Sequence, residues 1–577
     1  MKHIEKTGLR GSAIVLVLVF TSVCLIVLLG LLGWVGGNAR LTQRHCQYSR
    51  CVAAAEAATE KILTQMALDY KIYGHGYVLT NMDVYRAMRP TTNESMAWAG
   101  YTFMDVDGNA NKTYVSYTAS TNYKGLSATY AGLKGFANSF DVISNVREVN
   151  SPLTSVGAVQ QRLQLSTIPL YQFAIFYNLD LECNALPLMT VTGPVHCNAN
   201  VYLTPVNGLT FNSDLTCSGT IQLTPKPGNP LPNQNGPVTF KGAHDGGVST
   251  LSVPIGTNNS SAAVHQVIEV PPSTENPRSS LGLQRFYNKA DLIILVRNTN
   301  VVISSGLVNN FATVVPWTQV TNFINTNLYF MNQREGKNVK GVEIDVGKLI
   351  KWNTNTLLNP LRAVIPGGDI RTIFVAEQRT MASSEQSGVR LINGQQLPPR
   401  GLTVATPNPL YVRGHYNCPA AYLGTTNTAG SLPASLAADA ITILSTAWDD
   451  TKASGSLGSR GAADTTVNAA LLCGVVQTSP SVGYSGGIEN FPRFLEEWTD
   501  KTLTYSGSMV CMFDSQIATA KWNNINIYYN PPIRNWAFDN NFTDPNKLPP
   551  ATPNATILVR GDWRVAQPQS TNTTVTL

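Results

Sequence analysis

The chain has 577 residues, of which 43% are hydrophobic and only 13% are charged, and its formal net charge is +6. A charged fraction well below the usual ~25%, together with 9 Trp, 22 Tyr and 18 Phe to build cores, excludes a disordered chain and is typical of an extracytoplasmic protein rich in strands and turns. The positive charges form no basic cluster, so nucleic acid is excluded as an expected partner.

The first predicted element is a transmembrane helix. No charged residue lies between Arg10 and Arg40, and the stretch 12–35 is mostly apolar. About 20 apolar residues span a bilayer, whereas the core of a cleaved signal peptide has only about 7–15 residues. A plain single-pass anchor is the alternative to any more specific interpretation. The positive charges on the two sides are balanced, so they do not fix the orientation.

The helix is predicted to continue beyond the membrane segment. Residues 38–70 contain no proline and many good helix formers. Apolar residues recur there at steps of three, four and seven, which places them on one face of a helix. They are Val52, Ala55, Ile62, Met66 and Tyr70. We therefore predict one nearly continuous helix over residues 12–70, about 88 Å long at 1.5 Å per residue.

Three segments of this region carry a family resemblance: RGSAIVLVLV (Arg10–Val19), GNAR (Gly37–Arg40) and AAAEAA (Ala53–Ala58). Their order and spacing resemble the N-termini of PilX-type minor pilins and of the K-type pseudopilins of type II secretion. The resemblance covers residues 8–70. It implies a membrane-inserted, pilin-like protein that begins with a short basic leader.

The same resemblance implies a processing site. A prepilin peptidase would remove residues 1–11 by cutting between Gly11 and Ser12, with Arg10 holding the leader at the cytoplasmic face. Gly8 is a weaker candidate, because cleavage there would leave Arg10 in the membrane segment. Ordinary pilins carry Glu at the fifth mature position, where this sequence has Leu16. The K-type pseudopilins also lack that Glu, so its absence is consistent with a subunit at the tip.

The resemblance also implies partners and a location. The expected partners are membrane lipid, other pilin-like subunits, the prepilin peptidase, and the assembly platform of a type IV pilus or a type II secretion-like system. The helix would cross the inner membrane once, with the head in the periplasm or at the cell surface. Several head phrases, such as FYNKADLIILV and GGIENFPRFLEEW, look like those of large, uncharacterised pilus-assembly-like bacterial envelope proteins. That second resemblance implies no activity.

Residues 71–577 are predicted to form a mainly β head, because short Val, Ile, Thr and Tyr runs alternate with turn residues. Two segments match at an offset of 20 residues: VHCNANVYLTP (Val195–Pro205) and LTCSGTIQLTP (Leu215–Pro225). A period near 20 is typical of a β-solenoid coil. We expect an irregular, right-handed β-helix or stacked β layers, with a β-sandwich as the alternative. In a solenoid, Cys197 and Cys217 would lie on adjacent parallel strands.

Composition suggests three parts of the head: a first β unit (71–165), a solenoid-like region (166–320), and a β-rich region with helical patches and a frayed tail (321–577). The helical patches are predicted within residues 318–333, 433–450 and 490–501. The last of these would place Glu496 and Glu497 on a surface helix. A second echo, LYVRGHY (410–416) against ILVRGDW (557–563), predicts two equivalent strands that end in the same glycine turn.

The segment 105–114, DVDGNANKTY, places acidic and amide side chains at alternate positions, as in a calcium loop. The Glu that such a loop needs at its twelfth position is Ser116 here. A tight Asp-Gly hairpin turn is therefore the simpler interpretation of Asp105, Asp107, Asn109 and Asn111.

No pattern predicts catalysis, a cofactor or a metal. His196-Cys197 and His244-Asp245 lie outside any HxxxH or HExxH motif and are interpreted as solenoid turn and loop residues. No G-x-S-x-G elbow is present either. The predicted function is thus assembly and display. A membrane-anchored β-helix that binds or degrades polysaccharide is the alternative, which a groove with clustered acids or stacked aromatics would favour. A static membrane scaffold is the third functional hypothesis.

Overall fold

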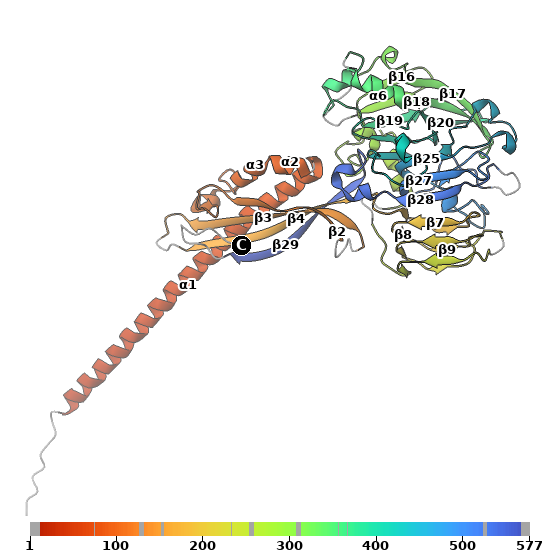
Figure 1. Ribbon diagram of the computed structural model, residues 1–577. Helices are drawn as coiled ribbons and strands as arrows, with labels where there is room; N and C mark the ends of the chain where they lie inside the picture. Colours follow the sequence, from red (N-terminus) through yellow and green to blue (C-terminus); the bar gives the residue numbers. More distant parts are fainter. Residues whose placement is uncertain are drawn as a thin grey trace, which may run out of the picture. The chain divides into compact units, whose positions relative to one another are not determined.

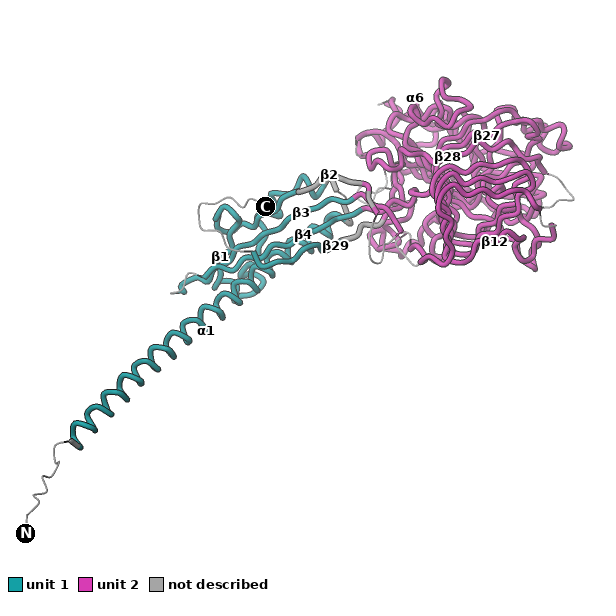
Figure 2. Tube along the Cα trace, turned by 60° about the horizontal axis from the view of Figure 1, so that its bottom comes forward, with its two compact units in different colours: residues 1–122, 137–166, 556–577 teal, residues 123–136, 167–555 magenta. Residues whose placement is uncertain are grey.

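The computed structural model describes residues 12–73, 75–125, 132–151, 155–231, 234–252, 255, 259–306, 313–355, 357–365, 367–522 and 528–566. The chain forms two compact units, which Figure 2 distinguishes by colour. Unit 1 comprises residues 1–122, 137–166 and 556–577, and unit 2 comprises residues 123–136 and 167–555. The divisions expected at 71–165, 166–320 and 321–577 stay predictions. The leader (1–11) and the tail predicted to fray (567–577) lie outside the described residues.

Unit 1 is built on one long helix. Helix α1 runs without a break from Ser12 to Tyr73 (Figure 1), which confirms the helix predicted over residues 12–70. The predicted apolar stripe is its buried side: Ala55, Ile62 and Met66 are fully buried. Three short helices follow: α2 (His75–Thr80), α3 (Met82–Ala87) and the 3-10 helix η1 (Met96–Gly100). The Tyr85 hydroxyl of α3 donates a 2.7 Å hydrogen bond to Asp69 of α1.

The second half of α1 packs on a five-stranded sheet. Its strands are β1 (Tyr101–Met104), β2 (Tyr114–Gly125), β3 (Lys134–Glu148), β4 (Val156–Pro169) and β29 (Asn554–Ala566). The order is β1-β3-β4-β29, and β2 also pairs with β3. The β1–β3 pairing is antiparallel. The chain enters unit 2 briefly over residues 123–136, forms most of unit 2 after β4, and returns to this sheet with its last strand, β29.

Helix α1 lies against β4 at Gly157, a residue that has no side chain. A Cβ added to Gly157 would lie 2.5 Å from the backbone N of Val52 and 2.6 Å from the carbonyl carbon of Cys51. Real Cβ atoms do not approach backbone atoms that closely. The neighbouring turns of α1 present small buried residues, Ala54, Ala55 and Ala58, to Phe103, Val146 and Val159 of the sheet. The alanine-rich segment therefore lets helix and sheet backbones come close together.

Unit 2 begins with three stacked coils of three short strands each. The first contains β5 (Ile175–Tyr177), β6 (Leu181–Cys183) and β7 (Met189–Thr192); the second β8 (Val195–Cys197), β9 (Val201–Leu203) and β10 (Leu209–Phe211); the third β11 (Leu215–Cys217), β12 (Ile221–Gln222) and β13 (Val238–Phe240), followed by β14 (His244–Asp245). Cys197 pairs with Cys217 in a parallel register. The β-solenoid prediction is therefore confirmed, and parallel stacking excludes the β-sandwich.

Polar side chains at the corners of these coils also stack at the 20-residue offset. The Asn198 side-chain amide donates to Asn178 Oδ1 at 2.9 Å, and Asn200 Oδ1 accepts from the backbone N–H of Thr220 at 3.0 Å. Each coil thus satisfies the turn of its neighbour, which fixes the register between coils.

From β14 the chain passes through α4 (Ser261–His265), η3 (Gln266–Ile268) and α5 (Phe286–Lys289) to the far end of the solenoid. There lie the antiparallel pairs β15 (Leu292–Val296) with β16 (Val301–Ser304), and β17 (Ile324–Asn332) with β18 (Lys337–Asp345), followed by α6 (Val346–Thr354). Short 3-10 helices decorate the loops of unit 2: η4 (Trp317–Gln319), η5 (Pro360–Ala363), η6 (Ala420–Tyr422), η7 (Asp450–Lys452), η8 (Leu457–Ser459), η9 (Ile488–Asn490), η10 (Asn540–Thr543) and η11 (Pro545–Lys547).

The chain then winds back in larger coils. Their strands are β19 (Thr372–Glu377), β20 (Glu385–Ile392), β21 (Leu402–Ala405), β22 (Leu410–Arg413), β23 (Ala434–Ala438), β24 (Ile441–Leu444), β25 (Thr465–Cys473), β26 (Pro492–Arg493), β27 (Thr502–Cys511) and β28 (Ile533–Phe538). One face runs β15-β19-β21-β23-β25-β27, and the other β18-β20-β22-β24-β26. Finally β27 pairs in parallel with β5, and β28 with β7 (Figure 1). The last coil in sequence therefore stacks on the first.

The three predicted helical patches are wrong. Residues 318–333 contain β17, residues 433–450 contain β23 and β24, and residues 490–501 contain β26. The alanines of β23 favour a helix on intrinsic propensity, but every residue of β23 is buried between neighbouring coils. Small side chains fit that space, so tertiary packing overrides local preference.

The second sequence echo is also not structural. Residues 410–413 form β22 of the solenoid, whereas residues 557–563 lie within β29 of the unit 1 sheet. Gly414 has φ +83° just after its strand, while Gly561 continues through β29. The two segments are therefore not equivalent strands with a shared turn.

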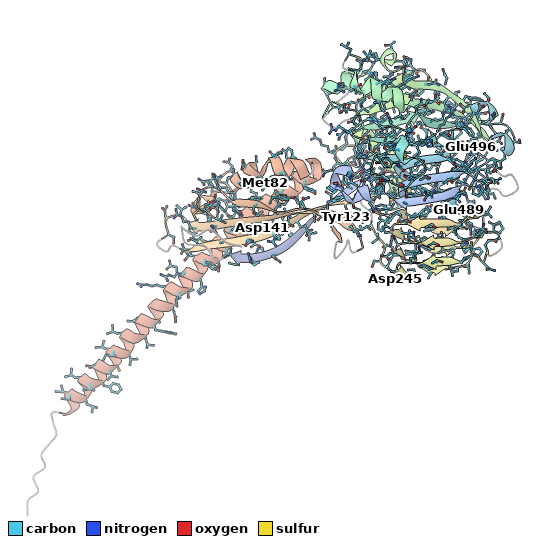
Figure 3. All side chains as sticks on the ribbon, in the orientation of Figure 1. Met82, Tyr123, Asp141, Asp245, Glu489 and Glu496 are labelled. Carbon is cyan, nitrogen blue, oxygen red and sulfur yellow. The ribbon has the colours of Figure 1, made fainter. Side chains whose placement is uncertain are left out.

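Glu496, predicted on a surface helix, is instead fully buried in unit 2 (labelled in Figure 3). The backbone N–H and the hydroxyl of Ser445 each donate a 2.6 Å hydrogen bond to its carboxylate. Burial outweighs these bonds and raises the pKa of Glu496 from 4.5 to about 7.

Substituting Gly157→Ala tests the close contact between α1 and β4. Because the added methyl must push two backbones apart, we expect a loss of roughly 1–3 kcal/mol in the free energy of unfolding of unit 1. Chemical unfolding of the detergent-solubilised protein measures it. Gly100→Ala is the matched control, since nothing lies within 4 Å of its added Cβ. Equal stabilities of the two variants would contradict the contact.

The pKa of Glu496 predicts a pH dependence of stability. The folded protein holds this proton more tightly than the unfolded chain does, so the contribution of Glu496 to stability falls as pH rises from 4.5 to 7. In Glu496→Gln this contribution is removed, and the decline over that window becomes shallower. Urea unfolding followed by tryptophan fluorescence at several pH values measures the slope. An unchanged slope would show that Glu496 titrates alike in both states.

Candidate membrane and assembly site

The first half of α1 presents an apolar surface without protein packed on it. Every residue of α1 from Ala13 to Cys46 is exposed, and the large apolar side chains up to Val35 are 53–71% exposed. Figure 3 shows these side chains standing out around the helix. Within the part of the chain that the structure describes, Ala13–Tyr70 is the one helical stretch long and apolar enough to cross a membrane. Leaving this surface in water costs about 25 cal/mol per Å².

The length and the polar groups of this half suit a bilayer. Residues 13–35 span about 35 Å at 1.5 Å per residue, and a hydrocarbon core is about 30 Å thick. The hydroxyls of Thr21 and Ser22 donate back to the carbonyls of Val17 and Leu18, at 2.8 and 2.7 Å. These polar side chains therefore need no partner from lipid.

A basic segment separates the apolar half from the docked half. Arg40 and Arg44 are exposed and lie one turn apart, just after the apolar half. Long basic side chains beside an apolar helix segment can extend toward lipid headgroups. Contact with the rest of unit 1 begins at Gln47, whose side-chain amide donates to the hydroxyl of Ser151, in the loop after β3, at 2.7 Å. Arg50 then pairs with Glu148 at 3.1 Å. The helix thus changes its surroundings from lipid-compatible to protein-packed within about two turns.

The predicted processing residues fall at the start of this site. Arg10 and Gly11 lie outside the described residues, and Ser12 is the first residue of α1. Cleavage between Gly11 and Ser12 stays a prediction. Leu16, the position that the resemblance compares with the Glu of ordinary pilins, is 70% exposed, and the first turn of α1 contains no acidic residue.

The candidate calcium loop is a turn stabilised by its own aspartate. Asp105 Oδ1 accepts from the backbone N–H groups of Asp107 and Asn109, and Oδ2 accepts from the Asn109 side chain at 2.9 Å. Asn111 continues the turn with φ +62°. The predicted Asp-Gly turn is present and is closed by an antiparallel bridge between Met104 and Ala110. It does not join β1 and β2 in a hairpin, because both strands pair with β3.

The two histidine pairs lie in strands rather than in turns or loops. His196 of β8 bonds Thr216 and Asn198 through its two ring nitrogens, at 2.8 and 3.0 Å, and burial lowers its pKa. His244 of β14 stacks on Phe240, with ring centroids 4.4 Å apart. No group of three His, Cys, Asp or Glu side chains able to hold a metal ion occurs within the described ranges.

Unit 2 contains a lateral cavity that the sequence did not indicate. It has a volume of about 510 Å³ and is lined by residues of the first coils (Asp180, Tyr202, Lys226) and of the last coils (Gln477, Asp514). A third copy of the 20-residue repeat was missed as well: Ile175 pairs with Val195, and Leu181 with Val201. Recognising that copy would have placed Asp180 at a coil corner.

No protein-family model matches the chain, and no curated protein matches it. Among solved structures, the crystal structure of the competence-associated pilin ComZ from Thermus thermophilus is similar at a TM-score of 0.27 and 10% sequence identity. The match covers 90% of this chain and 98% of that chain. A TM-score this low shows neither a shared fold nor a shared function. The functional conclusion therefore rests on the geometry of α1.

Charged substitutions in the apolar half test membrane insertion. Leu25→Arg with Leu29→Arg places two charges near the middle of the span, at a cost of about 2.5–3.5 kcal/mol each. We expect a clear drop in the protein fraction that resists alkaline extraction from membranes. The matched control is Leu41→Arg with Leu68→Arg, two exposed α1 positions outside the apolar segment. Equal extraction of both variants would contradict a bilayer location for residues 13–35.

Proposed function

We propose that this chain is a membrane-inserted, pilin-like envelope protein that assembles with other pilin-like subunits and displays a large β-solenoid head. One observation carries the proposal: a single unbroken helix has a bare apolar half and a second half docked on a sheet with antiparallel pairing. A plain anchor needs only the first half. The rigid continuation is what a subunit needs to pack its helix beside others while holding its globular part outside.

The assembly step follows from the two surroundings of α1. In the bilayer, lipid covers the apolar side chains of residues 13–35. When a subunit is drawn out of the membrane, the same side chains have to be covered by the helices of neighbouring subunits, because exposure to water is costly. The helix therefore favours a bundle of similar helices over solution. The machinery that would extract it is the assembly platform of a type IV pilus or a type II secretion-like system.

The size of the head and Leu16 favour a rare subunit at the tip. Unit 2 adds residues 123–136 and 167–555 to a small pilin-like unit, and heads of this size would crowd one another along a filament. A subunit with nothing ahead of it needs no acidic side chain to neutralise a neighbour's N-terminus. We place α1 in the inner membrane as a single pass, with the head in the periplasm or at the cell surface. The proposed role is display without catalysis.

Processing of the leader tests this proposal directly. In cells with a working prepilin peptidase, the mature chain should begin at Ser12, as read by mass spectrometry of the membrane-extracted protein. Gly11→Val should leave the leader attached, because a branched side chain obstructs the peptidase at the cut. Gly8→Val is the matched control and should be processed normally. An intact N-terminus on surface-exposed wild-type protein would leave only a membrane-tethered β-domain.

A further inference from the structure

The lateral cavity lies at the seam where the last coils of unit 2 stack on the first. Asp180, Tyr202 and Lys226 come from the first coils, whereas Gln477 and Asp514 follow β25 and β27. These walls meet only because β27 pairs with β5. The cavity is therefore a product of the closed solenoid and is absent from either part alone.

A connected row of polar groups joins the two walls. The ammonium of Lys226 lies 3.1 Å from Asp180 Oδ2, and only 9% of its side chain is exposed. It also donates to Gln477 Oε1 at 3.5 Å, and the Gln477 amide donates to Asp514 Oδ1 at 2.8 Å. Donors and acceptors thus alternate from Asp180 to Asp514. A backbone hydrogen bond from Asn200 to Asp180 at 3.1 Å keeps the first carboxylate in place.

The charges of this polar row disfavour the binding of anions. The single ammonium of Lys226 is paired with Asp180, and the second carboxylate, Asp514, has an amide as its partner. A phosphate or carboxylate ligand would meet net negative charge. A purely apolar ligand would strip water from charged groups without replacing their hydrogen bonds, which is costly.

The remaining lining offers apolar contact and hydroxyl partners. Pro227, Val475 and Val482 provide apolar surface beside the polar row. Tyr202 adds an aromatic side chain and a hydroxyl group. Sugar rings combine apolar C–H faces with edges of hydroxyl donors and acceptors. A cavity of about 510 Å³ falls in the range of small-ligand sites.

We propose that this cavity binds a neutral saccharide, with Asp180, Gln477 and Asp514 bonding its hydroxyls and Tyr202 contacting the ring. The head of the proposed pilin-like subunit would then recognise a glycan. This inference goes beyond the proposed assembly role and depends on unit 2 alone. Its test involves neither the leader nor α1, so the two proposals fail or succeed separately.

The test is saturation-transfer difference NMR on the full chain in detergent, with four neutral disaccharides as probes: maltose, lactose, cellobiose and di-N-acetylchitobiose. At least one should bind with a Kd of about 1 mM or tighter, equivalent to about −4 kcal/mol. Glucose 6-phosphate, as the anionic probe, should give no signal. Absence of binding by all four disaccharides, or preferential binding of the phosphate, would overturn the proposal.

Variants assign the binding to this cavity. Asp514→Asn and Tyr202→Phe should each weaken disaccharide binding at least about tenfold, a loss of about 1.4 kcal/mol. Asp245→Asn is the control, since Asp245 is exposed on β14 and does not line the cavity. Thermal unfolding confirms that the variants fold, and the two substitutions act on different walls. Binding that survives both, or that Asp245→Asn weakens equally, would refute this location.

Discussion

The parallel pairing of β27 with β5 and of β28 with β7 is the interaction on which unit 2 depends. The end of a solenoid has unpaired backbone N–H and C=O groups. Burying these groups is costly, and exposing them invites association with other chains. Here the first coils and the returning coils each supply an edge to the other. The joint turns two incomplete stacks into one continuous hydrophobic interior, which runs from Cys217 in the third coil to Ile303 at the opposite end.

This joint explains why unit 2 can be an insertion in a small helix-and-sheet unit. The coils begin just after β4 and finish just before β29, and both strands belong to the unit 1 sheet. The last strand can reach that sheet only if the winding path returns to where it began. Contacts such as Met509 with Ile175 therefore hold together chain ends that are remote in sequence. The cost is a high contact order, which favours slow folding of unit 2.

Local signals in the sequence were sufficient for α1 and for the solenoid class. The length of the apolar run predicted the first half of the helix, because lipid surrounds it on all sides, and apolar periodicity predicted the second half, because the sheet contacts one face. The Cys197–Cys217 echo predicted the stacking. The helix predicted over residues 433–450 is wrong because burial of β23 between coils outweighs propensity. Glu496 was misplaced because its partner, Ser445, lies far away in sequence. The cavity was unpredictable for the same reason, since its walls meet only across the joint.

The two halves of α1 show why composition predicts one site and not the other. A membrane acts on each residue of a helix independently of the fold, so the apolar segment up to Val35 can be recognised from residue types alone. The docked half needs a specific partner, and Gly157 of β4 meets the backbone of Cys51 and Val52, a pairing that neither segment specifies in its sequence. A glycine in a strand signals close backbone approach without naming the other chain segment. Only the folded sheet identifies α1 as that segment, because the contact exists only once β4 is paired within the sheet.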